Sequence, residues 1–350
     1  MKLILKTFAS LLSALVLWEI ILSNSVVKNS GFINHPVLGR INKAGIAVQG
    51  EEGFSRIKLN NLGMRGGDIS PKQKNEHRVL ILGDSYTKAV QVSDNKTYSY
   101  LLQKEIKNKL KLTFNTINAG RDGASPAYYI HLANFYDSEI QPDSVVIQLV
   151  DQDFTEDILD KAKQFHVVKK ANTFQTVYVN EFYSDNALSR LFLQKFPKLS
   201  FMVEYSVLRV GGNNFKKAMA AKPTHNNPEE SKVEKKPSPD YDEVIDWTLK
   251  TLKDKYPNLV ILYLPSIDNY ADITNEKPTK IERSLNKLAA KNNMNFINMR
   301  EDFLNYYHTY YKPAHGFNNT ILGGRGHINE IGHELSAKRL ANIFEERILK

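Results

Sequence analysis

The stretch RVLILGDSYT, residues 78–87, decides the fold. Its apolar run, residues 79–82, ends at Gly83, which is the pattern of a short strand buried on both faces of a sheet. Asp84, Ser85 and Tyr86 then follow where such a strand would meet a loop. Ser85 is therefore either a nucleophile held at the end of a buried strand or an ordinary turn serine, because Gly-Asp-Ser is also common turn chemistry.

Similar apolar runs recur along the chain and alternate with helix patterns. Further strands are predicted at residues 113–118, 144–150, 259–264 and 296–297. Helices are predicted at 98–110, after Ser125, after Thr279 with its capping-box partner Glu282, and at 331–344. This alternation indicates an α/β fold with a parallel sheet covered by helices on both faces.

The N-terminal segment predicts a membrane anchor over residues 1–25. Residues 3–22 are apolar apart from Lys6 and Glu19, and roughly 20 helical residues span a bilayer core. Lys2 and Lys6 favour a cytoplasmic N-terminus, which would make this a single-pass protein of the cytoplasmic membrane with its domain in the periplasm or outside the cell. A cleaved signal peptide and a buried helix are the alternatives, although no small-x-small cleavage site follows.

The rest of the chain divides by composition. Residues 26–55 show little periodicity and are interpreted as a juxtamembrane segment, and residues 56–350 as the functional domain. An insertion at 161–240 interrupts this domain, and its first part is expected to form a helical cap. Residues 220–240 are expected to be disordered, because they carry four prolines, many charges and little apolar surface.

Composition excludes several classes of function. The chain has 350 residues and a net charge of +9, but its Lys and Arg residues are scattered, which argues against a nucleic-acid partner. It has no cysteine, so disulfides, thiolate catalysis and cysteine-ligated zinc are excluded. With neither a HExxH motif nor a carboxylate cluster, we expect no metal and no cofactor. The oligomeric state stays open.

Polar residues follow the predicted strands where ligands gather in an open parallel sheet. They are Ser85 after the first strand, residues 118–123 after the second, residues 151–153 after the third, and residues 326–333 before the last helix. A serine, a histidine, glycine-rich turns and an amide would then face one crevice. This is the equipment of acyl transfer from an ester, in which imidazole activates the hydroxyl and amide donors stabilise the oxyanion.

These blocks, in this order, resemble the SGNH or GDSL-type hydrolase family. The resemblance begins at the lead-in NLGMRG, residues 61–66, and extends to about Leu349. It implies a three-layer α/β/α fold with a mainly parallel, flavodoxin-like sheet. It also implies that Ser85 is the nucleophile and one oxyanion donor, that Gly123 is the second donor, and that His327 is the base.

Two positions depart from the family pattern. Gln152 stands where the family has an oxyanion-donating asparagine, and its amide is one methylene longer. Gly324 stands where the family has the aspartate that orients the histidine, with Arg325 next to it. Asp302 and Glu330 are conceivable replacements, and a backbone carbonyl can also hold an imidazole tautomer. The residues predicted to support the site without joining the chemistry are Asp84, Asn118, Asp153 and Arg325.

Other polar and aromatic residues have a structural interpretation. His308 and His315 lie in an aromatic segment interpreted as a loop, residues 306–317, and are expected to pack, as are Tyr128 and Tyr129 in a helix. His333 and Asn329 are expected to be helix residues or caps.

Three functions fit the sequence. The first is a membrane-anchored serine esterase acting on O-acyl esters of envelope glycans or related small molecules. The second is a polysaccharide O-acyltransferase that uses the same acyl-enzyme. The third is a noncatalytic glycan-binding or assembly subunit, which the departures at Gln152 and Gly324 permit.

Overall fold

The computed structural model describes residues 2–24, 32–49, 52–154, 158–159, 161, 164–171, 173–179, 241–256, 258–272, 276–318 and 326–349. The chain forms two compact units, residues 1–31 with 182–239 and residues 32–181 with 240–350. Most of the segment expected to form a helical cap, the segment expected to be disordered at 220–240, Gly324 and Arg325 lie outside the described residues.

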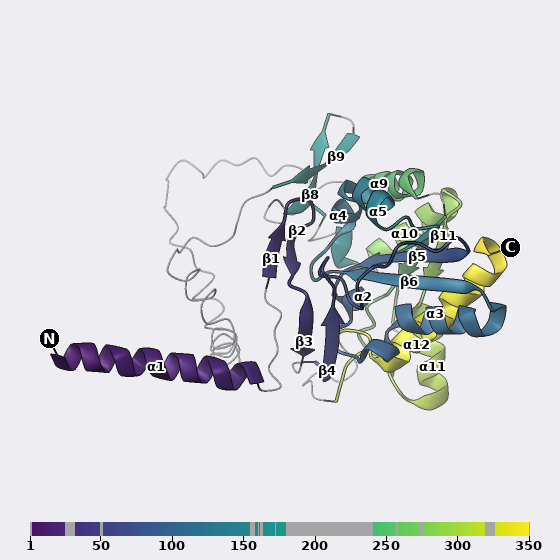
Figure 1. Cartoon of the computed structure of the whole chain (residues 1–350). Helices are drawn as coiled ribbons and strands as arrows, with labels where there is room; N and C mark the ends of the chain where they lie inside the picture. Colours follow the sequence, from purple (N-terminus) through teal and green to yellow (C-terminus); the bar gives the residue numbers. More distant parts are fainter. Residues whose placement is uncertain are drawn as a thin grey trace, which may run out of the picture. The chain divides into compact units, whose positions relative to one another are not determined.

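The larger unit is built on five parallel strands (Figure 1). They are β5 (Glu76–Gly83), β6 (Thr113–Gly120), β7 (Ser144–Leu149), β10 (Leu259–Tyr263) and β11 (Asn295–Asn298). Their order, β11-β10-β7-β5-β6, puts the first strand of the sheet second from one edge and is the flavodoxin-like order. Every strand predicted from the sequence is present.

Helices cover both faces of this sheet, and Figure 1 shows the resulting layers. One face carries α4 (Pro126–His131), α5 (Ala133–Glu139), α9 (Tyr241–Lys255) and α10 (Lys280–Lys291). The other face carries α3 (Tyr98–Leu110), α11 (Arg300–Tyr310) and α12 (Glu330–Ile343). Successive residues of β5 alternate between the two cores, with Leu80 and Leu82 in the first and Val79 and Ile81 in the second. Each of these side chains is fully buried, which stabilises the fold by about 1.5–3 kcal/mol apiece.

The segment interpreted as a juxtamembrane connection belongs to the folded unit, which begins at Phe32. It forms two hairpins, β1 (Phe32–His35) with β2 (Gly39–Asn42), and β3 (Gly45–Gln49) with β4 (Ser55–Leu59). Strand β4 buries every second residue, Ser55, Ile57 and Leu59, and Arg65 bridges Leu59 to Asn118 of β6. The strands are only four or five residues long, and the one clear alternation of polar and apolar residues, SRIKL in β4, is too short to identify a strand by itself.

The described part of the insertion forms a hairpin, β8 (Phe165–Lys170) with β9 (Thr173–Tyr178), and not the expected helix. The Phe165 ring packs edge-on against Tyr128 of α4 at a centroid distance of 4.8 Å. Tyr128 and Tyr129 are core residues, as expected.

Residues Lys2–Asn24 form one helix, α1, as the apolar run predicted. Within the described residues, however, no helix combines the length and the apolar character that crossing a bilayer requires. The predicted anchor is therefore not confirmed.

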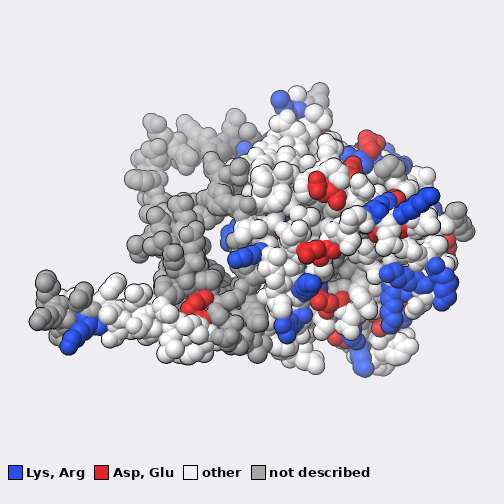
Figure 2. Space-filling model, viewed as in Figure 1, with Lys and Arg blue, Asp and Glu red and all other residues white. Residues whose placement is uncertain are grey.

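Charged side chains of both signs are interspersed over the face that Figure 2 shows. This agrees with the scattered positions of Lys and Arg in the sequence, and it offers no continuous basic surface on that face.

Candidate active site

The nucleophile turn connects β5 to the short helix α2 (Ser85–Lys88). Asp84 caps this helix, because its carboxylate accepts the Tyr86 N–H at 2.8 Å. Gly83 and Gly120 let the first turn of α2 pack closely against the ends of β5 and β6, which places Ser85 at the end of the strand. A Cβ on Gly83 would lie 1.8 Å from Thr87 Oγ1, and a Cβ on Gly120 would lie 2.1 Å from the Lys88 amide nitrogen.

Ser85 and His327 meet although they are 242 positions apart in the chain. Ser85 Oγ lies 2.7 Å from His327 Nε2, within the range predicted for a serine and its general base. On the far side of the ring, His327 Nδ1 lies 2.5 Å from a Glu52 carboxylate oxygen. The other Glu52 oxygen accepts the His327 backbone N–H at 2.9 Å. Ser85, His327 and Glu52 thus form a nucleophile-base-acid series with the geometry of a catalytic triad.

Glu52 is the acid that the sequence interpretation missed, and it comes from the turn between β3 and β4. Two glycines with positive φ lie beside it. Gly53 has φ +71°, and a Cβ there would lie 2.4 Å from the Gln91 carbonyl oxygen. Gly326 has φ +90°, and a Cβ there would lie 2.0 Å from Glu52 Oε1. The Glu52 carboxylate therefore needs glycine at position 326, and Gly53 lets the turn that carries Glu52 pack against Gln91.

The electrostatics favour an ionised Glu52. Partial burial by itself would raise the pKa of this carboxyl group, but the hydrogen bonds and the charge of His327 outweigh burial and hold the pKa below its usual value. Tyr86 packs its ring on His327 at a centroid distance of 4.7 Å and donates its hydroxyl to the Gly326 carbonyl at 3.2 Å. The imidazole is thus fixed by Glu52 on one side and by Tyr86 on its face.

The predicted oxyanion donors lie on the loops beside Ser85. As the first residue of α2, Ser85 has a backbone N–H with no acceptor inside the helix. Gly123 lies in an exposed turn with φ +65°, and Lys88 from the nucleophile helix pairs with the adjacent Asp122 at 2.5 Å. Gln152 is exposed, and in the described part of the chain neither it nor Gly123 hydrogen-bonds to Ser85 or His327. Their role as oxyanion donors stays a prediction.

Three of the predicted supporting residues hold the backbone around the site. Asp84 is the helix cap described above. Asn118 is buried, donates to the Thr87 carbonyl at 2.8 Å and to Ser99 Oγ at 3.0 Å, and accepts the Gly120 N–H. Asp153 is buried and accepts the Val150 N–H at 2.8 Å.

The two replacement acids considered from the sequence are engaged elsewhere. Asp302 pairs with Arg339 at 3.2 Å, and Glu330 pairs with Lys96 at 3.2 Å. Both suggestions are wrong, because the imidazole of His327 is held by Glu52. Glu52 lies 275 positions before His327, and no motif marks it in the sequence.

His333, His315 and Asn329 have structural surroundings, as expected, whereas His308 is exposed and does not pack as predicted. His333 is buried and accepts the Tyr98 N–H, and His315 is buried and bonded to the Tyr270 hydroxyl at 2.6 Å. Asn329 caps α12, and the exposed His308 lies on α11. In the described part of the chain, no group of histidines and carboxylates could hold a metal ion.

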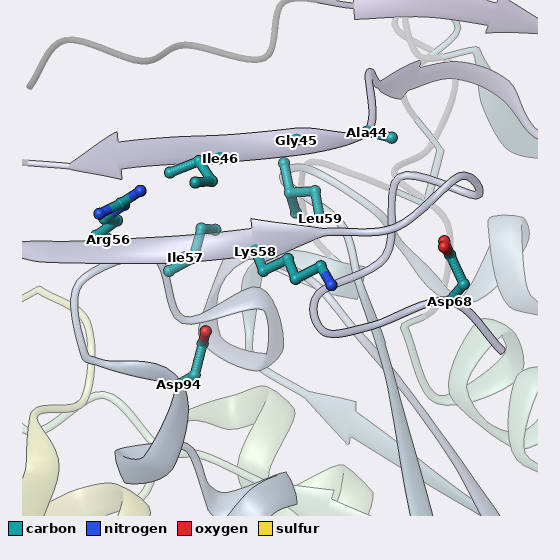
Figure 3. A pocket seen from close by; sticks show the side chains of 9 residues that line it. All are labelled: Ala44, Gly45, Ile46, Arg56, Ile57, Lys58, Leu59, Asp68 and Asp94. Atoms are coloured by element: carbon teal, nitrogen blue, oxygen red, sulfur yellow. The ribbon is translucent and has the colours of Figure 1, made fainter. Parts of the chain in front are cut away.

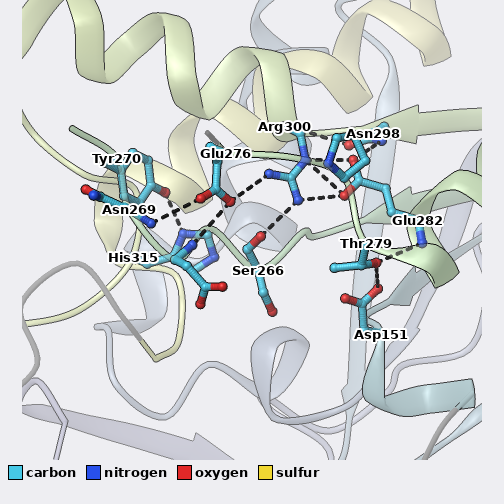
Figure 4. A network of polar contacts seen from close by, with 12 residues as sticks. Asp151, Ser266, Asn269, Tyr270, Glu276, Thr279, Glu282, Asn298, Arg300 and His315 are labelled. Carbon is cyan, nitrogen blue, oxygen red and sulfur yellow. Dashed lines mark hydrogen bonds and ion pairs between the residues drawn. The ribbon is translucent and has the colours of Figure 1, made fainter. Parts of the chain in front are cut away.

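A polar network fixes the loops at the ends of β7 and β10 (Figure 4). Arg300 is buried and forms a forked pair with Glu282, while a further guanidinium nitrogen reaches Glu276 at 3.1 Å. The Glu282 carboxylate is thus bound to Arg300, although Thr279 accepts the Glu282 N–H as the predicted cap. Asp151 accepts bonds from Tyr263 and Thr279, and burial raises its pKa.

A cavity of about 380 Å³ lies beside the β3–β4 hairpin (Figure 3). Arg56, Lys58, Asp68 and Asp94 line it together with apolar hairpin residues. Neither Ser85 nor His327 borders it, so the geometry of the triad, and not this cavity, identifies the candidate active site.

No known family profile matches the chain, and no curated protein matches it. Solved structures that it resembles include a putative GDSL-like lipase from Parabacteroides merdae, with 16% identity, a TM-score of 0.41 and coverage of 80% of this chain and 99% of that one. An acetyl xylan esterase, AlAXEase, gives 16% identity, a TM-score of 0.37 and coverage of 76% and 98%. A lipase/acylhydrolase from Enterococcus faecalis gives 12% identity, a TM-score of 0.39 and coverage of 77% and 96%. These neighbours are described as esterases and lipases, and likeness of this degree carries no argument about the function of this chain.

Proposed function

We propose that the protein is a serine esterase that hydrolyses O-acyl esters through an acyl-enzyme. The observation that carries this proposal is the continuous series from Ser85 Oγ through both ring nitrogens of His327 to the Glu52 carboxylate. A turn serine that only caps a helix has no reason to meet an imidazole whose second nitrogen is held by a carboxylate. The assembled triad also counts against a noncatalytic subunit.

The mechanism follows from the donors and acceptors. His327 Nε2 accepts the proton of Ser85 while Oγ attacks the acyl carbon, and Glu52 stabilises the imidazolium that forms. The backbone N–H groups of Ser85 and Gly123 are the proposed donors to the oxyanion, with the Gln152 amide as a third. The alcohol leaves with the proton from His327. Water activated by the same imidazole then releases the acid and restores Ser85.

The proposed substrate is an acetylated glycan of the cell envelope. The His327 and Glu52 side chains are 25% and 18% exposed, so the triad lies at the surface of the unit, where an ester on a polymer can approach. Location at an envelope membrane is also part of the proposal. It is supported by the large apolar side chains that α1 exposes, among them Phe8, Leu11 and Trp18.

The first experiment is hydrolysis of p-nitrophenyl acetate by the purified protein. Ser85→Ala and His327→Ala should each remove nearly all turnover, because the two residues act as a unit. The matched controls are Ser138→Ala and His308→Ala, which change an exposed serine and an exposed histidine away from the triad. Equal turnover by wild type and Ser85→Ala would show that Ser85 is only a turn residue.

Adding a sugar alcohol as acceptor separates hydrolysis from transfer. A transferase would divert the acyl group from water to the added hydroxyl, and the acylated sugar would accumulate in proportion to acceptor concentration. Release of free acetate that is independent of the acceptor is the result expected for an esterase.

A further inference from the structure

Lys88 is a buried lysine one turn beyond the nucleophile. It is 4% exposed, and no other lysine side chain that the structure describes is buried. An ammonium group is almost never buried without a partner, because nothing else compensates the loss of its hydration. The position of Lys88 therefore depends on the group that pairs with its charge.

The partner of Lys88 lies on the loop that carries the second proposed oxyanion donor. Lys88 Nζ donates to an Asp122 carboxylate oxygen at 2.5 Å, and Asp122 directly precedes Gly123. The Lys88 side chain is 5% exposed, whereas the Asp122 side chain is 53% exposed. The ion pair thus ties the helix of the nucleophile to the loop of the donor.

Residues 121–124 form a tight turn that sets the direction of the Gly123 N–H. The Ala124 N–H donates to the Arg121 carbonyl at 3.0 Å. Gly123 has φ +65° and Asp122 has no positive φ, which is the pattern of a type II turn. Turns of types I and II differ by a flip of the peptide between their two central residues. The direction of the Gly123 N–H therefore depends on how the peptide between Asp122 and Gly123 is held.

The other end of the ion pair is fixed to Ser85. Lys88 and Ser85 are three positions apart on α2, so their side chains leave the same side of this helix. The Ala89 N–H donates to the Ser85 carbonyl at 2.8 Å, and the Asn118 side chain donates to the Thr87 carbonyl at 2.8 Å. A movement of Asp122 relative to Lys88 would therefore change the distance between the Ser85 and Gly123 N–H groups.

We propose that Lys88 and Asp122 are positioning residues that hold the Gly123 N–H in register with the Ser85 N–H, so that both reach the oxyanion. This inference rests on the proposed esterase function. In this role neither side chain contacts the ester, and both act through the backbone of Gly123. Glycine permits the positive φ of this turn but also leaves its backbone adaptable. The ion pair restricts that freedom, and donors that are oriented before the reaction stabilise an oxyanion most effectively.

The main test is Lys88→Met, which removes the ion pair without leaving a buried charge. The melting temperature should stay within a few degrees of wild type, because an apolar side chain of similar volume often replaces a buried ion pair at little cost and Asp122 is half exposed. With p-nitrophenyl acetate kcat should fall roughly 10- to 10²-fold, somewhat less than when an oxyanion donor is lost altogether. KM should change little, because the donors act in the transition state. Lys250→Met is the matched control, since it removes a Lys–Asp pair of the same length on α9.

Variants of Asp122 distinguish positioning from a direct effect of the lysine charge. Asp122→Ala should lose as much kcat as Lys88→Met, and Asp122→Asn, which keeps an acceptor for the ammonium group, should lose less. The double variant Lys88→Met with Asp122→Ala should lose no more than Lys88→Met alone, because the two residues act as a unit. If the lysine charge itself stabilised the oxyanion, Asp122→Asn would keep or raise kcat, and this result would overturn the proposal.

A tetrahedral inhibitor gives a readout that a purely structural role would not move. Benzeneboronic acid forms a tetrahedral adduct with a catalytic serine, so its inhibition constant should rise in Lys88→Met by about the factor by which kcat falls. An unchanged kcat in Lys88→Met, additive losses in the double variant, or an unchanged inhibition constant would each overturn the inference while the esterase stands. Absence of turnover by the wild type would instead refute the esterase, and the inference would fail with it.

Discussion

Glu52→Gln is the variant that most directly probes the candidate active site. The Glu52 carboxylate accepts two hydrogen bonds from one residue, from His327 Nδ1 and from the His327 backbone N–H. Glutamine has a single acceptor oxygen. If that oxygen keeps the bond to the backbone N–H, the amide NH₂ faces Nδ1 and forces the ring proton onto Nε2. A protonated Nε2 can no longer accept the proton of Ser85.

The expected loss in kcat for Glu52→Gln is roughly 10³- to 10⁴-fold, or about 4–5.5 kcal/mol of activation free energy. This loss in kcat has two causes, the missing charge-assisted hydrogen bond and the wrong tautomer of His327. It resembles the loss measured when the aspartate of a Ser-His-Asp triad is replaced by asparagine. KM should change little, because Glu52 contacts His327 and not the ester. Glu52→Asp keeps the charge but shortens the reach by one methylene, so its loss should be smaller.

The assay is steady-state hydrolysis of p-nitrophenyl acetate, with ¹⁵N NMR of the histidines to observe the tautomer directly. Asp302→Asn and Glu330→Gln are the matched controls, because these carboxylates pair with Arg339 and Lys96 and not with His327. The reasoning would be refuted by a Glu52→Gln variant that keeps most of its kcat, or by a control that loses as much activity as Glu52→Gln does.

Three further predictions follow from the same contacts. Gly326→Ala should lower kcat strongly, because its Cβ would lie 2.0 Å from Glu52 Oε1. Gly45→Ala should affect only stability, because Gly45 has a positive φ but its Cβ would meet nothing within 4 Å. Steady-state kinetics of the two variants measure the difference. Gly324→Asp should raise turnover little, since Glu52 already holds the imidazole, and a large gain in kcat would mean that it does not. Burial lowers the pKa of His333 from 6.5 to about 3, so below pH 6.5 the unfolded chain binds a proton that the folded chain does not. The contribution of His333 to the free energy of unfolding should be complete above pH 6.5. Between pH 6.5 and pH 3 the free energy of unfolding should fall by up to about 1.4 kcal/mol per pH unit. Urea unfolding at pH 7 and pH 5 should show a weaker pH dependence in His333→Gln, and an unchanged dependence would contradict the assignment.

The sheet was predictable because its signals are local. Residues 79–82 are apolar without interruption, and residues 145–150 are apolar except for Gln148, which is the pattern of strands covered on both faces. The hairpins at residues 32–59 give no comparable signal. Their strands are short, and only alternate positions such as Ile57 and Leu59 are buried, between residues as polar as Arg56 and Lys58.

Glu52 could not be found from the sequence for a related reason. Ser85 and His327 each lie in a motif whose neighbours constrain them, as Gly83 and Asp84 do for the serine. An orienting carboxylate needs only a position from which it reaches Nδ1, and any loop that the fold brings there can supply it. In this chain the loop that supplies the carboxylate joins β3 to β4. It lies in residues 26–55, whose composition indicated a juxtamembrane segment and not a part of the site. In the proposed triad Glu52 takes the role that the family resemblance assigns to the position of Gly324, and Gly326 leaves the space that its carboxylate occupies.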